Sequence, residues 1–199
     1  TVESHNSLCS NHIFIAGSDE QKAKYLPPLT SGEVLGAWAL TEPGAGSDAG
    51  SIATTAAFDG KDWVLNGSKT FTTQGSVAGT YVLFAKTPAG GEYKAGLTAF
   101  VCEKGRPGLV VGKLEHKMGI RASDTAQLHL NGLRLPPGQV LGRPGRAFID
   151  AMKVLDGGRV GISGVAVGIA RGALEEGIKR VKSRKAEFGL DDGGPGLRW

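Results

Sequence analysis

Residues 59–67 read DGKDWVLNG, in which a short apolar run, Trp63 to Leu65, lies between the turn pairs Asp59-Gly60 and Asn66-Gly67. Asp-Gly and Asn-Gly pairs favour the tight turns that join antiparallel strands. Further runs with strand character follow; these are YVLFA at 81–85, LTAFV at 97–101 and the alternating QLHL at 127–130. Short strands separated by tight turns predict an antiparallel, barrel-like β-domain over residues 36–147.

Helical patterns flank this β region on both sides. Ser18, followed by Asp19 and Glu20, is typical of a helix N-cap with an acidic first turn, and Pro27-Pro28 is expected to end that helix. From residue 148 onward, apolar residues recur at spacings of three and four, which predicts a long helix over 148–189. The expected fold class is therefore α+β, with helices over 1–35, the β-domain, the long helix and a disordered tail at 190–199.

The long helix contains a stripe of glycines, which is unusual for a helix interior. Gly157, Gly161, Gly164, Gly168 and Gly172 follow one another at spacings of three and four. Each costs roughly 1 kcal/mol relative to alanine, so the stripe predicts close approach by another helix or a ligand. We find no second long helix in the chain, and expect this one to pack against something outside it.

Composition excludes several classes of protein. Glycine accounts for 32 of 199 residues but without a three-residue period, which excludes collagen. The longest nearly apolar run, 160–170, is too short to span a bilayer, and we expect neither a membrane span nor a signal peptide. Cys9 and Cys102 lie far apart and the four histidines show no ligand spacing, so no metal site is predicted.

Charge is unevenly distributed around a net value of +4. Residues 1–50 contain two basic and six acidic side chains, whereas residues 101–150 contain eight basic and four acidic ones. This asymmetry has two interpretations: a solvated basic face, or a surface for an anionic ligand such as a nucleotide or phosphate ester. Basic residues are not interleaved with aromatic ones, so we do not expect nucleic-acid binding.

A glycine-rich turn at 44–49, GAGSDA, matches the GxGxxA form of the dinucleotide fingerprint. That fingerprint needs a helix directly after it, but residues 51–55, SIATT, are β-branched and favour a strand, which argues against a Rossmann fold. Such a turn is either an ordinary surface turn or a source of backbone N–H groups for a pyrophosphate.

Two segments combine an aromatic residue with hydroxyl groups: WALTEPGAGS at 38–47 and Phe71-Thr72-Thr73. Phe71 suits stacking on a flat heteroaromatic ring, and the threonines suit hydrogen bonding to its polar edge. The alternative is two ordinary strands, since Thr and Phe both favour sheets.

Four strings in order resemble the acyl-CoA dehydrogenase family of FAD flavoproteins, and most closely its short-chain, bacterial-type branch. They are LTEPGAGSDAG at 40–50, NGSKTFTTQ at 66–74, KMGIRASDTAQL at 117–128 and LDGGRVGISGVAVGIARGAL at 155–174. The resemblance implies the end of an N-terminal helical domain, a complete middle β-domain for flavin and acyl-CoA, and the first helix of a C-terminal bundle. It also implies a chain truncated at both ends.

The resemblance assigns roles to individual residues. It places Thr41 at the polar edge of the flavin, Ser47 near the pyrophosphate and the thioester, and Thr73 at flavin N5. Phe71 stands where the family usually has tryptophan. The implied cofactor-binding set is Trp38, Leu40, Thr41, Gly46, Ser47, Phe71, Thr72, Thr73 and Arg184, of which Arg184 would reach FAD of a neighbouring subunit. The implied substrate-binding set is Ser47, Asp156, Gly157, Gly158 and Arg159.

One departure from the family pattern falls at the end of the long helix. The family usually has R-x-x-F-G there, whereas Arg184 is followed by Phe188-Gly189 with one extra residue.

The implied reaction is FAD-dependent α,β-dehydrogenation of an acyl-CoA thioester, in fatty-acid or branched-chain amino-acid breakdown. The implied partners are the acyl-CoA substrate, an electron-transfer flavoprotein and further copies in a homotetramer. The expected compartment is the bacterial cytoplasm, or the mitochondrial matrix in a eukaryote.

The resemblance also bears on the catalytic base. We expect no catalytic residue in this chain, because the branch has its glutamate farther downstream, so the chain alone should be inactive. A second branch of the family has its glutamate on the long helix, at the position of Gly158. Glu42 lies beside Pro43 within the first signature, and we interpret it as stabilising the turn. Two alternatives stay open: an acyl-CoA oxidase or related member, and a non-catalytic β-module that binds a partner.

Overall fold

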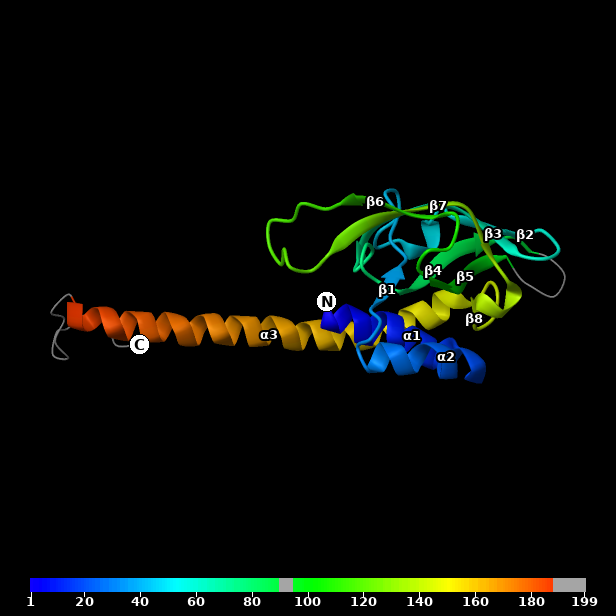
Figure 1. The fold of residues 1–199 in the computed structure, drawn as a ribbon. Coiled ribbons are helices and arrows are strands. Elements are labelled where there is room, and N and C mark those ends of the chain that lie inside the picture. The colour runs from blue at the N-terminus through cyan, green and yellow to red at the C-terminus, as the bar shows by residue number, and fades with distance from the viewer. Residues whose placement is uncertain (90–94, 188–199) are drawn as a thin grey trace. The chain divides into compact units, whose positions relative to one another are not determined.

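The computed structural model describes residues 1–89 and 95–187, the last three by their backbone alone. Short helices come first, a sheet follows, and one long helix comes last (Figure 1). The helical elements are η1 (Ser4–Ser10), α1 (Asn11–Ala16), α2 (Asp19–Thr30), η2 (Ala49–Ser51), η3 (Pro137–Gln139) and α3 (Ala147–Glu187). The strands are β1 (Gly36–Ala39), β2 (Thr55–Phe58), β3 (Trp63–Thr73), β4 (Thr80–Thr87), β5 (Gly96–Glu103), β6 (Leu109–Leu114), β7 (Thr125–Leu135) and β8 (Val140–Leu141). The α+β class is confirmed.

The eight strands form one sheet in the order β6-β7-β3-β2-β4-β5-β8, with β1 paired to β4. The runs at 63–65, 81–85, 97–101 and 127–130 lie in β3, β4, β5 and β7, as expected. Neighbouring strands are antiparallel except that β1 and β2 both run parallel to β4. The parallel pairing places the carboxyl end of β1, where the candidate segment 38–47 begins, beside the middle of the sheet.

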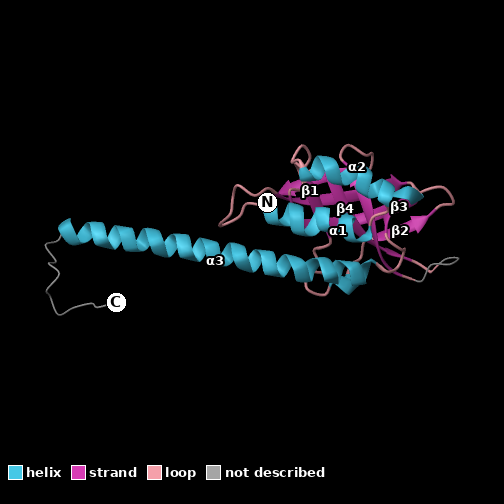
Figure 2. Cartoon of the chain, turned by 90° about the horizontal axis from the view of Figure 1, so that it is seen from below, coloured by secondary structure: helices cyan, strands magenta, loops and turns pink. Residues whose placement is uncertain are grey.

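Helices α1 and α2 lie over one face of the sheet (Figures 1 and 2). They bury apolar side chains against β1, β4 and β5 in one of two core clusters; the other lies between β3, β4, β5 and β7. Helix α2 begins as predicted: the side chain of Ser18 accepts from Gln21 N, and Gln21 Oε1 accepts from Ser18 N at 2.9 Å. This reciprocal pair is a capping box, which satisfies N–H groups that a helix start leaves without partners.

The predicted end of α2 at Pro27-Pro28 is wrong, because the helix continues to Thr30. A proline removes its own N–H donor but keeps its carbonyl as an acceptor. Here Ser31 N donates to Pro27 O and Val34 N donates to Pro28 O, both at 3.0 Å. These bonds carry the backbone through one further turn before the chain enters β1.

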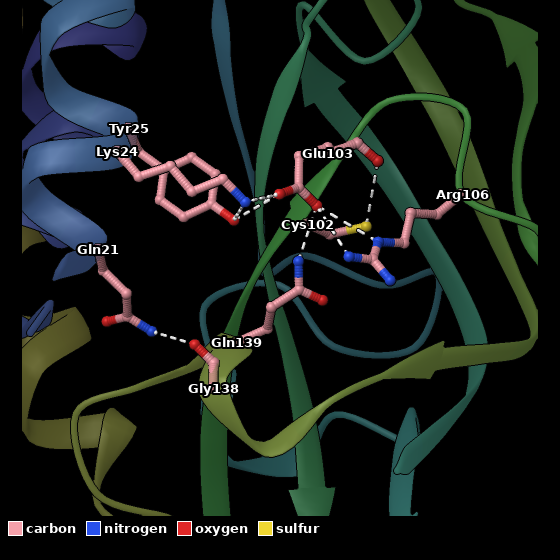
Figure 3. A network of polar contacts seen from close by, with 8 residues as sticks. All are labelled: Gln21, Lys24, Tyr25, Cys102, Glu103, Arg106, Gly138 and Gln139. Carbon is pink, nitrogen blue, oxygen red and sulfur yellow. Dashed lines mark hydrogen bonds and ion pairs between the residues drawn. The ribbon is translucent and has the colours of Figure 1, made fainter.

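Glu103, at the end of β5, connects α2 to the sheet (Figure 3). Its carboxylate accepts from Tyr25 Oη at 2.6 Å, Lys24 Nζ at 2.5 Å and Gln139 Nε2 at 2.7 Å, and from Arg106 at 3.3 Å. Burial acts to raise the pKa of Glu103, but the donors from Lys24 and Tyr25 outweigh it and lower that pKa to about 2. The network fixes the helical segment on the sheet.

The chain divides into two compact units, Thr1–Gly158 and Arg159–Trp199. The predicted long helix is confirmed as α3; residues 188–189 and the tail predicted at 190–199 lie outside the described residues. Exposed branched aliphatic side chains in the second unit include Val160, Ile162, Val167, Ile169, Leu174 and Val181. Apart from the neighbouring backbone of α3 itself, a methyl group added at Gly164, Gly168 or Gly172 meets no atom of the described residues within 4 Å. Of the helices that the structure describes, none combines the length and apolarity needed to cross a membrane.

Candidate functional site

The two segments with aromatic and hydroxyl side chains lie side by side in the first unit. Thr70 N donates to Thr41 O at 2.9 Å, and this bond joins the chain just after β1 to the last residues of β3. A second link is made by Lys69, whose Nζ donates to Leu40 O at 3.2 Å. The structure therefore brings 40–42 and 69–73 together, although 27 or more residues separate them in the sequence.

Lys69 and Glu42 form a buried ion pair beneath this junction. Their side chains are 0% and 5% exposed, and Lys69 Nζ lies 2.6 Å from Glu42 Oε1. Burial lowers the pKa of Lys69 to about 8, against the opposing effect of Glu42. Burial acts to raise the pKa of Glu42, but hydrogen bonds from Lys69 and Thr54 hold it below its usual value. Both groups are charged at neutral pH.

The segment after Thr41 folds into a tight turn. Glu42 N donates to Ala45 O at 2.9 Å, and Ala45 N donates back to Glu42 O at 3.1 Å. The Glu42 carboxylate also accepts from Ala53 N at 2.5 Å and from Thr54 N at 3.1 Å. Gly46 and Ser47 follow this turn and are exposed. Glu42 thus holds the turn in place, as expected for it, and leaves the next residues open to a ligand.

The end of β3 has an irregular backbone with an exposed aromatic ring. Phe71 has φ +53° and its side chain is 64% exposed. A positive φ is rare for a bulky residue and costs of order 1–3 kcal/mol, so such strain is a pointer to function. The pairing with β7 is interrupted between Lys69 and Thr72, and this bulge turns Phe71 outward.

Two residues that follow Phe71 in the sequence have buried side-chain polar atoms for which the described residues supply no hydrogen-bond partner. These atoms are Thr72 Oγ1 and both amide atoms of Gln74, which itself has φ +65°. Thr73 is half-buried and pairs with Thr125 of β7. Buried polar atoms are nearly always satisfied in native proteins, so this group marks a place where a polar ligand edge would supply partners.

Trp38 and Leu40 point into the core between the helices and the sheet, unlike the exposed Phe71 and Ser47. The indole of Trp38 packs edge-on against Phe84 with 4.8 Å between ring centroids, and its Nε1 donates to His12 Nδ1 at 3.4 Å. Leu40 is buried in the same core cluster between helices and sheet. Flavin contact by these two residues stays a prediction, with the Leu40 carbonyl already accepting from Lys69.

The residues predicted to border acyl-CoA lie on α3. Asp156 and Gly157 are exposed, and Gly158 is half-buried. A methyl group at Gly158 would lie 3.2 Å from Leu8 Cδ2 of η1, so this position faces the N-terminal helices. Arg159 and Arg184 are exposed residues of the second unit. Their roles stay predictions.

Lys69 was missed by the sequence analysis, although the sequence carries a signal for it. Side chains alternate between the two faces of a strand, so Lys69 shares the face of Trp63 and Leu65, both of which are buried. A lysine at an inward position requires an acidic partner. The alternation could have pointed to a buried ion pair, with Glu42 as its acid.

The residues of the site offer the groups that a flavin requires. A flat ring needs an aromatic face and hydroxyl or backbone donors along one edge. The exposed ring of Phe71, the half-buried Thr41 and Thr73 and the open turn at 46–47 meet those needs within one unit. The residues present therefore fit the group.

The ends of β1 and β3 thus combine, within a mostly antiparallel sheet domain, the features of a site for a flat cofactor that carries a pyrophosphate. Residues 1–33 match the model of the acyl-CoA dehydrogenase N-terminal domain, and residues 37–133 match that of the middle domain. The chain belongs to the acyl-CoA dehydrogenase family.

Individual relatives agree with this assignment. The chain is 47% identical over 199 residues to a short-chain specific acyl-CoA dehydrogenase of Clostridium acetobutylicum, covering 100% of this chain and 52% of that protein. The structure of butyryl-CoA dehydrogenase from Megasphaera elsdenii matches with a TM-score of 0.88 at 42% identity, covering 97% of this chain and 49% of that one. A glutaryl-CoA dehydrogenase from Mycobacterium smegmatis, in complex with FADH2, matches with a TM-score of 0.84 at 34% identity, over 92% and 45%. The chain spans about half the length of these relatives.

Proposed function

We propose that this chain forms the FAD- and acyl-CoA-binding part of an enzyme that dehydrogenates acyl-CoA thioesters between the α and β carbons. The observation that carries the proposal is the hydrogen bond from Thr70 N to Thr41 O, which brings both hydroxyl-bearing segments to one place. The family assignment and the relative that holds FADH2 support flavin as the ligand.

The residues of this chain bind and orient. The Thr41 hydroxyl and backbone hold the polar edge of the flavin, the Thr73 hydroxyl and the Thr72 backbone lie along the same edge, and Phe71 covers one ring face. Ser47 and the N–H groups of the open turn at 46–47 take the pyrophosphate. The chemistry that FAD supplies when bound is acceptance of a hydride. The apolar cluster beneath β1 excludes water from the inner side.

The α-proton needs a base, and Glu42, which directly follows Thr41, is not free to act as one. Glu42 is occupied by Lys69 and by two backbone N–H groups. Gly158 stands where one branch of the family has its glutamate, and glycine has no side chain to serve. We therefore propose that the base comes from residues outside these 199. Asp156 and Arg159 border the acyl-CoA in this proposal, and Arg184 reaches FAD of a neighbouring subunit.

An electron-transfer flavoprotein as acceptor, a homotetramer, and a bacterial cytoplasmic or mitochondrial location belong to the same proposal. The oxidase alternative differs only in the electron acceptor, which would be oxygen instead of an electron-transfer flavoprotein. Stopped-flow reoxidation of the reduced holoenzyme distinguishes them: rapid reoxidation by electron-transfer flavoprotein and slow reoxidation by oxygen support a dehydrogenase, and the reverse supports an oxidase.

Flavin binding is the direct test of the proposal. The purified protein, titrated with FAD, should acquire a perturbed visible flavin spectrum with one site per chain. A protein that leaves the FAD spectrum unchanged at every concentration would instead support the non-catalytic β-module. The 199-residue chain, supplied with FAD and butyryl-CoA, should form no enoyl-CoA above background; measurable product would contradict the assignment of the base.

A further inference from the structure

The buried pair Lys69–Glu42 lies at the point where both halves of the candidate flavin site meet. Lys69 belongs to β3, two residues before Phe71, and Glu42 directly follows Thr41. Lys69 Nζ donates to Leu40 O at 3.2 Å and to Glu42 Oε1 at 2.6 Å. The ammonium group of Lys69 therefore binds both neighbours of Thr41: the backbone carbonyl of Leu40 before it and the side chain of Glu42 after it.

Glu42 extends this connection to a third segment. Its two carboxylate oxygens accept from Ala53 N at 2.5 Å and from Thr54 N at 3.1 Å, in addition to Lys69. Thr54 in turn lies against Gly67 of β3, where a methyl group would come within 2.3 Å of Thr54 Oγ1. The site segments and the start of β2 are thus held at one charged centre.

Stability alone is a weak reason for such a pair. Removing two charges from water is costly, and a well-packed apolar pair of similar volume often stabilises a fold as well or better. Hydrogen bonds between charged groups do, however, impose direction and distance, which apolar packing does not. The location of the pair beneath Thr41 and the strained Phe71 indicates a need for fixed geometry.

We propose that Lys69 and Glu42 are positioning residues for the flavin, a role that rests on the proposed function. Neither residue is placed in contact with the ligand. Together they hold Thr41 in register with 71–73, so that hydrogen-bonding groups from both segments reach one ring edge. Loss of the link leaves the fold intact and lets the two segments shift relative to each other.

The test uses the double variant Lys69→Met with Glu42→Gln in the FAD-loaded protein. The change Glu42→Gln keeps a carbonyl oxygen that accepts from Ala53 N and Thr54 N, and together the two changes leave no lone buried charge. The charged side-chain link between the segments is therefore removed, while the backbone bond from Thr70 N to Thr41 O remains. The single variant Lys69→Met leaves the Glu42 carboxylate buried without its counter-charge, so it lowers stability as well as removing the link. Lys24→Met is the matched control, because it breaks a lysine–glutamate pair elsewhere, at Glu103.

We expect the double variant to recover most of the melting temperature that Lys69→Met loses. Its Kd for FAD should nevertheless stay at least tenfold above that of the unaltered protein, with a changed visible flavin spectrum. Lys24→Met should leave both flavin measurements unchanged. A merely structural pair would predict that flavin affinity and spectrum recover together with the melting temperature, and that outcome would overturn the inference.

Two further outcomes are separable. If the unaltered protein binds no FAD, the proposed function fails; if it binds FAD and the double variant binds equally well, only the positioning role fails. Should the double variant not fold, Glu42→Gln alone is used, since it keeps an acceptor for the backbone N–H groups; because it leaves Lys69 without its counter-charge, its melting temperature is measured beside its FAD affinity. At least a threefold weaker FAD affinity with an unchanged circular dichroism spectrum supports the role, and unchanged affinity overturns it.

Discussion

The phenol of Tyr25 donates to the Glu103 carboxylate at 2.6 Å, and this bond joins α2 to the end of β5. Lys24 and Gln139 donate to the same carboxylate from α2 and η3 (Figure 3). Four donor side chains on one acid, with Arg106 as the fourth, make Glu103 the polar centre of the contact between the N-terminal helices and the sheet. Loss of the Glu103 carboxylate should therefore lower the free energy of unfolding of the first unit.

Replacement of Glu103 by Gln should lower the free energy of unfolding by about 1–3 kcal/mol, because Lys24 and Arg106 lose a charged acceptor. The folded pKa of Glu103 is about 2, below the value of 4.5 for an unperturbed carboxyl. Stability from this group is therefore complete above pH 4.5 and is lost as the pH falls toward 2. Urea unfolding between pH 2 and 7 measures both effects, and a variant with the same pH profile as the parent would contradict them.

His12 should make the fold sensitive to mild acid. Burial lowers its pKa from 6.5 to about 4, so the unfolded chain binds a proton that the folded chain rejects. Stability is complete above pH 6.5 and falls by roughly 3 kcal/mol as the pH decreases to 4. His12→Gln should flatten thermal stability across this window. His116→Gln, at an exposed position, is the control, and an equal effect of both substitutions would refute the assignment to His12.

Gly67 should not tolerate a side chain. Its φ is +153°, and a methyl group would lie 2.3 Å from Thr54 Oγ1 and 2.8 Å from Thr54 Cα. Gly67→Ala should cost more than about 2 kcal/mol of unfolding free energy through strain and steric conflict. Gly60 has φ +97° with nothing within 4 Å, so Gly60→Ala isolates the backbone strain and should cost about 1 kcal/mol. Equal costs in denaturant titrations would show that the contact with Thr54 is unimportant.

Phe71 should show a conflict between stability and binding. Because glycine adopts positive φ without steric cost, Phe71→Gly should leave the unfolding free energy unchanged or raise it by up to about 1 kcal/mol. Loss of stacking should weaken FAD binding about tenfold, as measured by fluorescence titration. Phe58→Gly, in regular strand β2, should do the opposite, lowering stability without affecting FAD. A Phe71→Gly variant with unaltered FAD affinity would remove Phe71 from the site.

Local signals in the sequence predicted most of the elements. The Ser18 cap, the alternation at 127–130 and the spacing of apolar residues after 148 each depend on near neighbours, and each corresponds to an element of the structure. The end of α2 was misplaced because the carbonyls of Pro27 and Pro28 find donors in the following loop. That outcome depends on the path of the chain after the helix, which proline alone does not determine.

The site was only partly predictable. The types of residue in 38–47 and 71–73 indicated a flat ring as the ligand. Nothing local indicates that Thr70 would meet Thr41, because that contact depends on how the strands pair across the sheet. The direction of Trp38 was unpredictable for the same reason: it depends on His12 and Phe84, which come from distant parts of the chain.

The complete burial of Lys69 makes this lysine a natural reporter for chemical footprinting. An amine-reactive reagent that modifies exposed lysines can reach Lys69 only when 40–42 separates from β3. The rate of its labelling, followed by mass spectrometry, therefore measures how often that joint opens, and a ligand seated across it should slow the reaction.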